Sequence, residues 1–494
     1  MVPMAPEPGT TAPAPDPAPL LEELVTLRLE NAALHRENRA LRAENAVLHE
    51  RVRELEARLG QTSANSSRPP SSDPPQAPAQ RRPPPTGRKR GGQPGHRGVH
   101  RALLPVEQVD EIVAVVPERC RHCQQPFPDT AAHRRARVWR HQVVELLPLA
   151  VRVTEYQMAV RYCPACRKRT RADLPPGVPR RPFGTRLTAV IALLSGRYRL
   201  SRREVRQLLQ DLWAVRVSLG AVVRQEQVQS AALAPVVDEA RAAVQQAAVV
   251  NLDETGWRQE QQRAWLWTVV TAELTLFRID RSRSGAAIEA VLGSWFAGVV
   301  GSDRWSAYRR FPAERRALCW AHLKRDFQAL VDRGGEAAPI GRWGLGESER
   351  LFALWHGFRA GEYDRKALQR RLIPLQARMG RLLRRGLDNP DRKAAALCRE
   401  LIKWWAALWT FARVEGVEPT NNVSERALRP AVLWRKSSFG SNSEAGSRFA
   451  ERLLTVVVTC RQQRRGLLDL LVTAAEAALR GTAAPSLLPA WQGS

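Results

Sequence analysis

The sequence predicts a mixed α/β core, and three observations support that prediction. Two apolar runs, residues 247–252 and 297–302, are each followed directly by an aspartate. Residues 264–279 alternate as a β-hairpin does, and residues 284–296 have the apolar spacing of a helix. Three strands, a crossover helix and a further strand that ends on an acid match the ribonuclease-H-like arrangement. Residues 316–322 are predicted to form another short strand after it.

The two aspartates are Asp253 and Asp303, and a third carboxylate, Glu425, lies where residues 419–429 read as the start of a helix. We expect each strand to end at its aspartate, because a charge at a strand end escapes full burial. If the three side chains converge, they form an all-oxygen cluster of the kind that holds Mg²⁺ or Mn²⁺. Glu254 competes with Asp253, but neighbouring residues of a strand point to opposite faces.

The composition points to a polyanionic partner. The chain has 77 Lys and Arg against 49 Asp and Glu in 494 residues, so its formal charge is +28, and nucleic acid is the leading candidate. Four of the seven Cys fall into C-x-x-C pairs, which favours metal binding in a reducing compartment over disulfides. No apolar window is long enough to cross a membrane and no export signal is present, so we expect a cytoplasmic protein.

Taken in chain order, residues 1–19 are rich in Pro and Ala, so we expect disorder. Residues 20–60 carry a seven-residue repeat of leucine with asparagine in the partner position: Leu27, Leu34, Leu41, Leu48 and Leu55, with Asn31, Asn38 and Asn45. This heptad pattern predicts a parallel two-stranded coiled coil, and therefore a homodimer. A single amphipathic helix packed on its own chain is the alternative.

Residues 61–102 are rich in Ser, Pro, Gly and Arg without periodicity, which predicts a linker. Its basic block includes Arg88, Lys89 and Arg90. A basic arm that follows DNA phosphates and a merely solvated linker are both compatible with this block.

The next domain, residues 103–182, contains two C-x-x-C pairs: Cys120 and Cys123, then Cys163 and Cys166. Four thiolates at this spacing predict a tetrahedral Zn²⁺ site, and a structural one, because no coordination position stays open for a substrate. The long gap between the pairs requires an inserted strand pair, which the alternation in residues 137–160 can supply. Unligated cysteines are the alternative.

Residues 183–246 read as helical. Ser201 and Glu204 form a capping-box pattern at the start of one helix, and the helical pattern breaks near residues 215–218 before a second helix. A DNA-binding helix-turn-helix and two scaffold helices explain this outline equally well.

Several basic residues follow Glu425, among them Arg426, Arg429, Lys436 and Arg448. They fit a setting in which phosphate lies nearby, and the first three are candidate contacts to DNA. Glu425 is also placed to cap the helix that begins near Asn422, which would be a purely structural role. Asp326 and Glu444 are the competing acids for the cluster.

Besides the leucine repeat and the cysteine pairs, five motifs are specific: residues 65–73, 91–98, 253–255, 319–322 and 420–430. Together they resemble the insertion-sequence-sixty-six family of bacterial DDE transposases over nearly the whole chain. The resemblance implies that Asp253, Asp303 and Glu425 are the catalytic triad. The family commonly has Asn-Arg-Ala-Glu where this chain has Asn-Val-Ser-Glu, so Val423 replaces a basic residue.

The same resemblance implies a catalytic domain over residues 247–480, with a helical insertion at about 335–415 and a tail over 481–494. It implies cutting of DNA at the ends of an insertion element and joining of the new 3′ hydroxyl to target DNA. Two Mg²⁺ or Mn²⁺ ions per site would compensate the charge of the phosphoryl group. His322, Asn421 and Asn422 are candidates for supporting roles.

The implied partners are the terminal repeats of the element, target DNA, a second copy of the chain and accessory proteins of the same element, in the bacterial nucleoid. Two other functions stay open. One is a dimeric, zinc-containing DNA-binding protein with an inactive nuclease core, which would need no magnesium. The other is a nuclease with the same triad that does not use a 3′ hydroxyl for joining.

Overall fold

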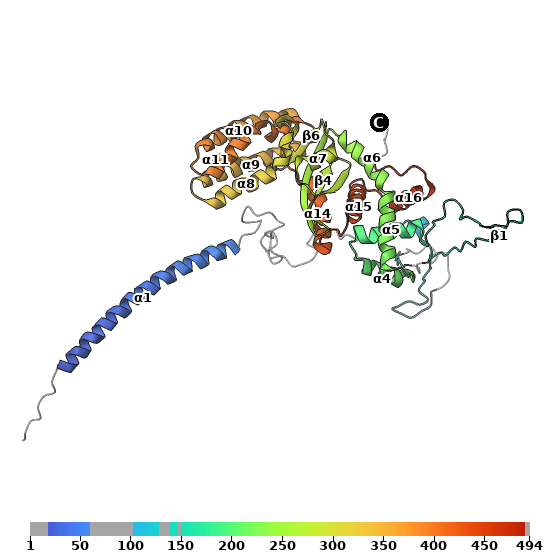
Figure 1. Ribbon diagram of the computed structural model, residues 1–494, viewed down its shortest axis with the longest axis horizontal. Coiled ribbons are helices and arrows are strands. Elements are labelled where there is room, and N and C mark those ends of the chain that lie inside the picture. Colours follow the sequence, from blue (N-terminus) through green and yellow to red (C-terminus); the bar gives the residue numbers. More distant parts are fainter. Residues whose placement is uncertain (1–17, 60–101, 128–138, 147–149, 490–494) are drawn as a thin grey trace, which may run out of the picture. The chain divides into compact units, whose positions relative to one another are not determined.

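The structure is a computed structural model that describes residues 18–59, 102–127, 139–146 and 150–489. Its two units are residues 1–82 with 325–342, and residues 83–324 with 343–494. Most of the described structure is helical, and a five-stranded mixed sheet lies in the second unit (Figure 1). Arg88, Lys89 and Arg90 lie outside the described residues. None of the described helices is long and apolar enough to cross a membrane.

Helix α1 spans Ala18–Leu59 without interruption, as the heptad pattern predicts (Figure 1). The repeated leucines with described side chains are exposed on it: Leu27, Leu34, Leu41, Leu48 and Leu55. A second helix on this leucine face would bury them. The structure describes a single chain, so the coiled coil stays a prediction.

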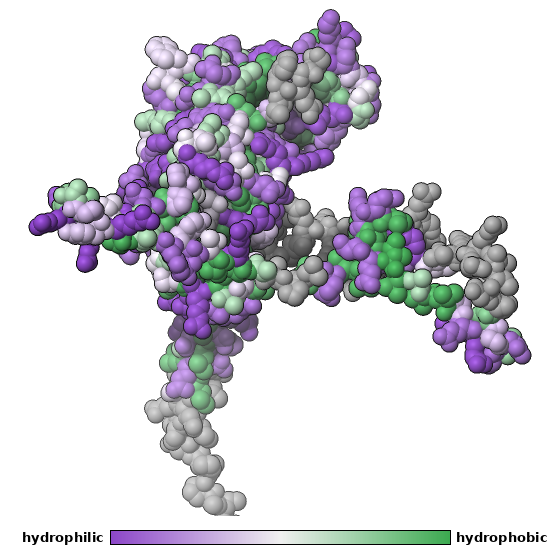
Figure 2. Space-filling view, turned by 90° about the vertical axis from the view of Figure 1, so that its right-hand side faces the viewer, coloured by the Kyte–Doolittle hydropathy of each residue, from purple (hydrophilic) through white to green (hydrophobic). Residues whose placement is uncertain are grey.

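The described residues of the cysteine domain, 103–182, form one 3-10 turn, η2 (Val106–Gln108), and one hairpin, β1 (Val160–Tyr162) with β2 (Arg169–Arg171). The strand pair expected within residues 137–160 is absent from the described part of that range, where only Val160 begins a strand. Alternation forms a strand only against a partner, and no described residue from 102 to 187 is buried. Figure 2 views the protein from the side on which Figure 1 labels β1. Hydrophobic residues, in green, are visible at the surface in this view.

Four helices follow: α3 (Thr185–Ala192), which continues into a π-helical turn η3 (Leu193–Arg197), then α4 (Arg202–Trp213), α5 (Leu219–Ala232) and α6 (Ala234–Gln245). The predicted capping box at Ser201 and Glu204 is formed in full. Helices α3, α4 and α5 share a small core that includes Ile191, Leu209 and Val222. Six residues of α5 are buried. Packing of this extent is typical of a scaffold helix, and the helix-turn-helix stays a prediction.

The sheet contains β3 (Val249–Gln259), β4 (Gln262–Val270), β5 (Thr275–Asp280), β6 (Val299–Ser302) and β7 (Arg316–Leu318). Its spatial order is β5-β4-β3-β6-β7, in which β3, β4 and β5 are antiparallel neighbours and β6 and β7 run parallel to β3. Helix α7 (Gly285–Leu292) connects β5 to β6, and the turns η4 (Ser306–Arg310) and η5 (Ala313–Arg315) precede β7. This is the predicted order of elements.

Two strand ends differ from the prediction. β3 does not stop at Asp253 but continues to Gln259, because the neighbouring strand β4 supplies hydrogen-bond partners along that whole length. β7 ends at Leu318, so His322 lies in the following helix and not in a strand.

The two faces of the sheet pack against different sets of helices, and α15 contributes residues to both. Odd-numbered residues of β3, such as Trp257, pack with Leu428 of α14 (Asn422–Ser438) and Leu454 of α15 (Glu444–Gln462). Even-numbered residues, such as Leu252, belong to the core that contains α6 and α7. Asp253 therefore lies on the face that α14 covers.

The segment between β7 and α14 is helical, as expected for an insertion near residues 335–415. It consists of α8 (Trp320–Arg333), α9 (Ala337–Arg359), α10 (Arg365–Arg385), η6 (Gly386–Asp388), α11 (Arg392–Lys403), α12 (Trp405–Leu408) and α13 (Thr410–Arg413). Helix α16 (Leu467–Arg480) follows α15 near the carboxyl end of the chain.

Candidate active site

Asp253 and Asp303 reach the same edge of the sheet because their strands are parallel neighbours. In the register of β3 and β6, Asn251 pairs with Gly301. Each aspartate lies two residues beyond its member of that pair, so both come just after the parallel pairing ends. A Cβ atom at Gly301 would lie 2.4 Å from Asn251 Oδ1, so a larger residue there would displace the Asn251 side chain.

Glu425 belongs to the first turn of α14, and Asn421, the residue before that helix, fixes where it begins. The Asn421 side-chain Nδ2 donates to the carbonyl oxygen of Leu252 at 2.6 Å. Its main-chain N–H donates to Cys319 Sγ at 3.1 Å. The start of α14 is therefore tied to the residue directly before Asp253.

Cys319 extends this connection to the third acid-bearing segment. The Cys319 N–H donates to the carbonyl oxygen of Ser302 at 3.1 Å, and Ser302 directly precedes Asp303. The next residue, Trp320, donates its N–H to the carbonyl oxygen of Pro419 at 2.8 Å. Cys319 is buried, at 3% exposure. Three segments that are far apart in the chain thus meet at one thiol-bearing turn, and we call Asp253, Asp303 and Glu425 the acidic site.

The carboxyl group of Asp253 is strongly perturbed. Burial raises the pKa of Asp253 well above its usual range, and the negative charges of Glu254, Asp303 and Glu425 raise it further. A hydrogen bond from the Glu254 N–H to Asp253 Oδ1, at 2.9 Å, acts in the opposite direction. These electrostatic effects mean that the carboxylates lie close enough to repel one another.

Asp303 is held by donors and cations. Burial raises the pKa of its carboxyl, whereas the Trp305 N–H, which donates to Asp303 Oδ1 at 2.8 Å, and the cations Arg283 and Arg316 lower it. Arg316 is itself buried and donates to the Asp303 carbonyl oxygen at 3.0 Å. Burial lowers the pKa of this guanidinium to about 10.

Glu254 is engaged elsewhere, on the opposite face of the sheet from Asp253. Its Oε1 accepts two hydrogen bonds from Arg283, at 2.9 and 2.8 Å, and its Oε2 accepts one from the Tyr308 hydroxyl at 2.5 Å. The side chain is 2% exposed. Arg283 and Tyr308 were not singled out from the sequence, because no local pattern marks a residue that pairs with a buried acid 29 or 54 positions away.

His322 and Asn422 can now be placed. His322 Nε2 lies 3.7 Å from Glu425 Oε1, so this histidine contacts the acidic site from α8. Asn422 is the first residue of α14, and the N-cap residue Asn421 makes no side-chain capping bond. Since the N-cap is Asn421 and not Asn422, Glu425 is the fourth helical residue, one position beyond the one that a capping box uses.

No group of three or more His, Cys, Asp or Glu side chains in the described residues is arranged to hold a metal ion. One observation nevertheless concerns metal binding. The buried Asn421 Oδ1 has no hydrogen-bond partner in this part of the chain, although the Nδ2 of the same amide is fixed by Leu252. A buried amide oxygen beside carboxylates is a hard donor of the type that Mg²⁺ and Mn²⁺ accept.

The two cysteine pairs have matching local geometry. In each, the first cysteine's carbonyl oxygen accepts an N–H from the residue four positions later, Gln124 or Arg167, at 2.9 Å. Both of these residues have a positive φ, 61° and 55°. Backbone N–H groups within each turn lower the pKa of Cys120 and of Cys163, which favours the thiolate. Each turn alone thus has the properties of half a thiolate metal site.

The candidate DNA contacts Arg426, Arg429 and Lys436 are exposed on one face of α14. Arg448 does not join them. It contacts Glu444 at 3.9 Å and Glu451 at 2.7 Å on α15.

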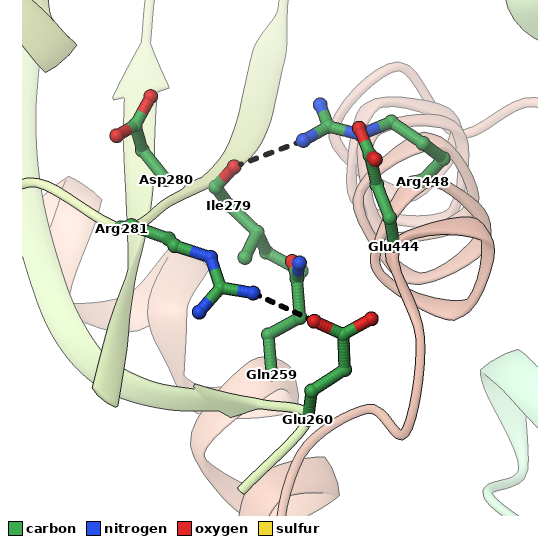
Figure 3. Close-up of a pocket in the computed structure, with 7 residues that line it drawn as sticks. All are labelled: Gln259, Glu260, Ile279, Asp280, Arg281, Glu444 and Arg448. Atoms are coloured by element: carbon green, nitrogen blue, oxygen red, sulfur yellow. Dashed lines mark hydrogen bonds and ion pairs between the residues drawn. The ribbon is translucent and has the colours of Figure 1, made fainter. Parts of the chain in front are cut away.

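Glu444 and Arg448 line a polar pocket of about 320 Å³ whose other walls come from the ends of β3 and β5 (Figure 3). Gln259 in this pocket is six residues beyond Asp253 on β3, which corresponds to about 20 Å. Glu444 is therefore not a member of the acidic site. The pocket's acids outnumber its two arginines, so it is not suited to an anion.

Comparison with known proteins gives two family matches. Residues 180–449 match the transposase IS66 family, and residues 16–102 match a family of unknown function, DUF6444. Two uncharacterized proteins of Sinorhizobium fredii are also similar. The protein y4qI is 26% identical over 229 residues, 42% of either chain. The protein y4hP is 24% identical over 266 residues, 47% of this chain and 48% of that protein.

The chain thus spans less than half the length of these two relatives. The IS66 match is more extensive in this chain: it covers more than half of it, and it includes the whole sheet and all three carboxylates of the acidic site. The chain belongs to the IS66 family of transposases.

Proposed function

We propose that the protein cuts DNA at the ends of an insertion element and joins the new 3′ hydroxyl to target DNA, with a divalent metal at the acidic site of a ribonuclease-H-like core. The observation that supports this most is the meeting of Asp253, Asp303 and Glu425 at one edge of the sheet. The strand order and the mixed strand directions agree with that core. Family membership supports the reaction class.

The residues that would hold the metal are the three carboxylates of the acidic site, with Asn421 Oδ1 as a further oxygen donor. When bound, two Mg²⁺ or Mn²⁺ ions supply a Lewis acid for the phosphoryl group and a lowered pKa for the attacking water. The excess of buried negative charge fits such a cation, because the repulsion that raises the pKa of Asp253 would be relieved by it.

The chain's own contribution is positioning. The Trp305 N–H orients the Asp303 carboxylate, and the bonds of Asn421 hold the start of α14 against β3. His322 Nε2 lies where its protonated form would offset the charge of Glu425. The positive charges of Arg283 and Arg316 lie near Asp303 and lower the pKa of its carboxyl.

The cysteine domain would carry one structural Zn²⁺ ion, bound by Cys120, Cys123, Cys163 and Cys166. The matched turns support this proposal, and so does the lack of a buried residue from 102 to 187 among those described. A small domain without a core needs another source of stability, and a metal is one. Titration with zinc followed by metal analysis of the purified chain tests this.

DNA would bind along the exposed basic face of α14, and α1 would pair with α1 of a second chain. Two element ends must be cut and joined together, so a dimer fits the reaction. A Leu34→Asp and Leu41→Asp double variant should change the mass in solution from dimer to monomer, as measured by light scattering. Accessory proteins of the same element are further candidate partners.

One observation favours a second candidate, a DNA-binding protein with an inactive nuclease core. It is the lack, in the described residues, of a group already arranged to hold a metal ion. Such a protein would bind DNA without any output that depends on magnesium.

The two functions are separated by incubating the full chain with a duplex that carries the element's own ends, with and without Mg²⁺. We expect cut and joined products only with Mg²⁺, and none from Asp303→Asn. The exposed carboxylate Asp238 provides the matched control, because Asp238→Asn should leave both products unchanged. DNA binding without any product in the natural chain would favour the inactive-core alternative.

A further inference from the structure

Four flat side chains stack in alternation and end near Asp303, and we call them the Arg–Trp stack. Arg263 lies over the Trp265 ring at 4.7 Å from its centroid, and Arg283 lies over the same ring at 4.4 Å. Arg283 also lies over the Trp305 ring, at 3.9 Å. The stack joins β4, the loop before α7 and the turn after β6. Its last member, Trp305, is two residues from Asp303.

The Trp305 ring is held in place more firmly than a surface side chain usually is. Its Nε1–H donates to the Arg283 carbonyl oxygen at 3.3 Å, and the Arg283 guanidinium lies against its face. That guanidinium is itself fixed by two hydrogen bonds to the buried Glu254. Arginine stacked on an indole and paired with a carboxylate loses little further freedom when a ligand binds.

Trp305 is nevertheless 37% exposed, so part of it stays accessible two residues from a proposed catalytic carboxylate. The exposure of a single tryptophan would mean little by itself. Here the ring is immobilised, and the main-chain N–H of the same residue donates to Asp303 of the acidic site. A planar, immobilised, partly exposed ring is suited to a planar ligand, and the DNA base is the planar group nearest to a phosphate.

We propose that Trp305 is the platform on which an unpaired base of the DNA strand stacks while that strand's phosphate lies at the acidic site. This inference rests on the proposed function and names the form of its substrate, a DNA end with an unpaired nucleotide. The base must be unpaired, because both faces of a base inside a duplex are covered by its neighbours. Stacking on an aromatic ring accepts any base, so the contact adds affinity without reading sequence.

The test measures binding of the full chain to two DNA probes in buffer without added magnesium or manganese. One probe is a blunt duplex, and the other carries a short 3′ single-stranded overhang with 2-aminopurine at its first unpaired position. We expect the natural chain to bind the overhang probe more tightly and to quench its fluorescence. Trp305→Ala should weaken binding of that probe about tenfold, or about 1.4 kcal/mol, and should remove the quenching.

The variant set separates the ring from other effects. Trp305→Ala keeps the main-chain N–H that orients Asp303, so only the ring is lost. Trp305→Phe should restore most of the affinity and the quenching. Trp295→Ala is the matched control, because Trp295 is 92% exposed and is not a member of the Arg–Trp stack. It should behave as the natural chain does.

Three results would overturn the proposal: equal affinity of the natural chain for both probes, unchanged overhang binding in Trp305→Ala, or an equal loss for both probes. Failure of the proposed function is a separate result, because it is read from cut and joined products with Mg²⁺. A chain that forms no product but binds the overhang through Trp305 would contradict the function and keep the base-stacking site.

Discussion

The acidic site and the cysteine domain are built in opposite ways. The three carboxylates come from β3, from the end of β6 and from α14, and hydrogen bonds through Asn421 and Cys319 join those segments. The four cysteines come from two short turns, each complete in itself, in a region where no described residue is buried. The acidic site is assembled by the fold, whereas each cysteine turn is formed locally.

This difference predicts which of the two regions needs a bound metal in order to fold. A core that packs well elsewhere can hold like charges together at a cost in stability, and function commonly uses such a strained site. A domain without a core has no such reserve, so its metal would be part of its folding free energy. The predictions below test this contrast from the largest expected effect to the smallest.

Asp253→Asn should lower metal-dependent cutting and joining by about 1000-fold or more, the size of a lost transition-state contact. The same change should stabilise the metal-free protein, because it removes a buried charge that Glu254, Asp303 and Glu425 repel. We expect the melting temperature to rise by about 2–4 °C, which corresponds to about 1 kcal/mol. Calorimetry without divalent cations measures it, and a lower melting temperature would contradict the contrast.

Replacing Cys163 and Cys166 by Ser should reduce bound zinc from about one ion per chain to none. Because no described residue of that region is buried, proteolysis within residues 103–182 should become at least about tenfold faster. Cys398→Ser is the matched control, since this buried cysteine lies in α11, outside the cysteine domain. If zinc content is the same in all three proteins, the thiolate site does not exist.

Glu254→Gln should lower the free energy of unfolding by about 2 kcal/mol, because Arg283 and the Tyr308 hydroxyl lose a buried charged acceptor. Glu260→Gln removes a comparable pair with Arg281 that is about half exposed, and it should cost less than about 1 kcal/mol. Chemical denaturation of both variants gives the comparison. Equal losses would mean that burial of Glu254 contributes nothing.

Cys319→Ala should reduce activity about tenfold by loosening the start of α14, since the Asn421 N–H loses its acceptor. Cys319→Ser keeps an acceptor of similar size and should retain most of the activity. The ratio of the two rates at saturating DNA is the measurement. A serine variant as impaired as the alanine variant would assign the effect to packing of the thiol and not to its hydrogen bond.

Several features of the fold could be predicted from the sequence, because they depend on patterns among neighbouring residues. The long helix α1, the capping box at Ser201, the helical content of residues 335–415 and the order of the strands are confirmed. Each depends on periodicity, on spacing or on a cap, and those are properties of neighbouring residues. The separation of Asp253 from Glu254 also followed from strand alternation alone.

Other features depended on partners that local sequence does not specify. The alternation within residues 137–160 predicted strands, but alternation cannot supply a neighbouring strand, and the described residues there are exposed. Arg448 looked like part of a basic setting for Glu425, yet the packing of α15 places it with Glu451. Charge near a site in sequence says little about charge near it in space.

The sequence by itself identified the candidate site residues: the acids Asp253, Asp303 and Glu425, and the two cysteine pairs. Only the tertiary structure decided how the acids are held, through Asn421 bound to Leu252 and to Cys319, and that β3 continues past Asp253 because β4 lies beside it. The physical reason is that hydrogen bonds and burial are formed between segments far apart in the chain. Their partners are set by the packing of the whole domain.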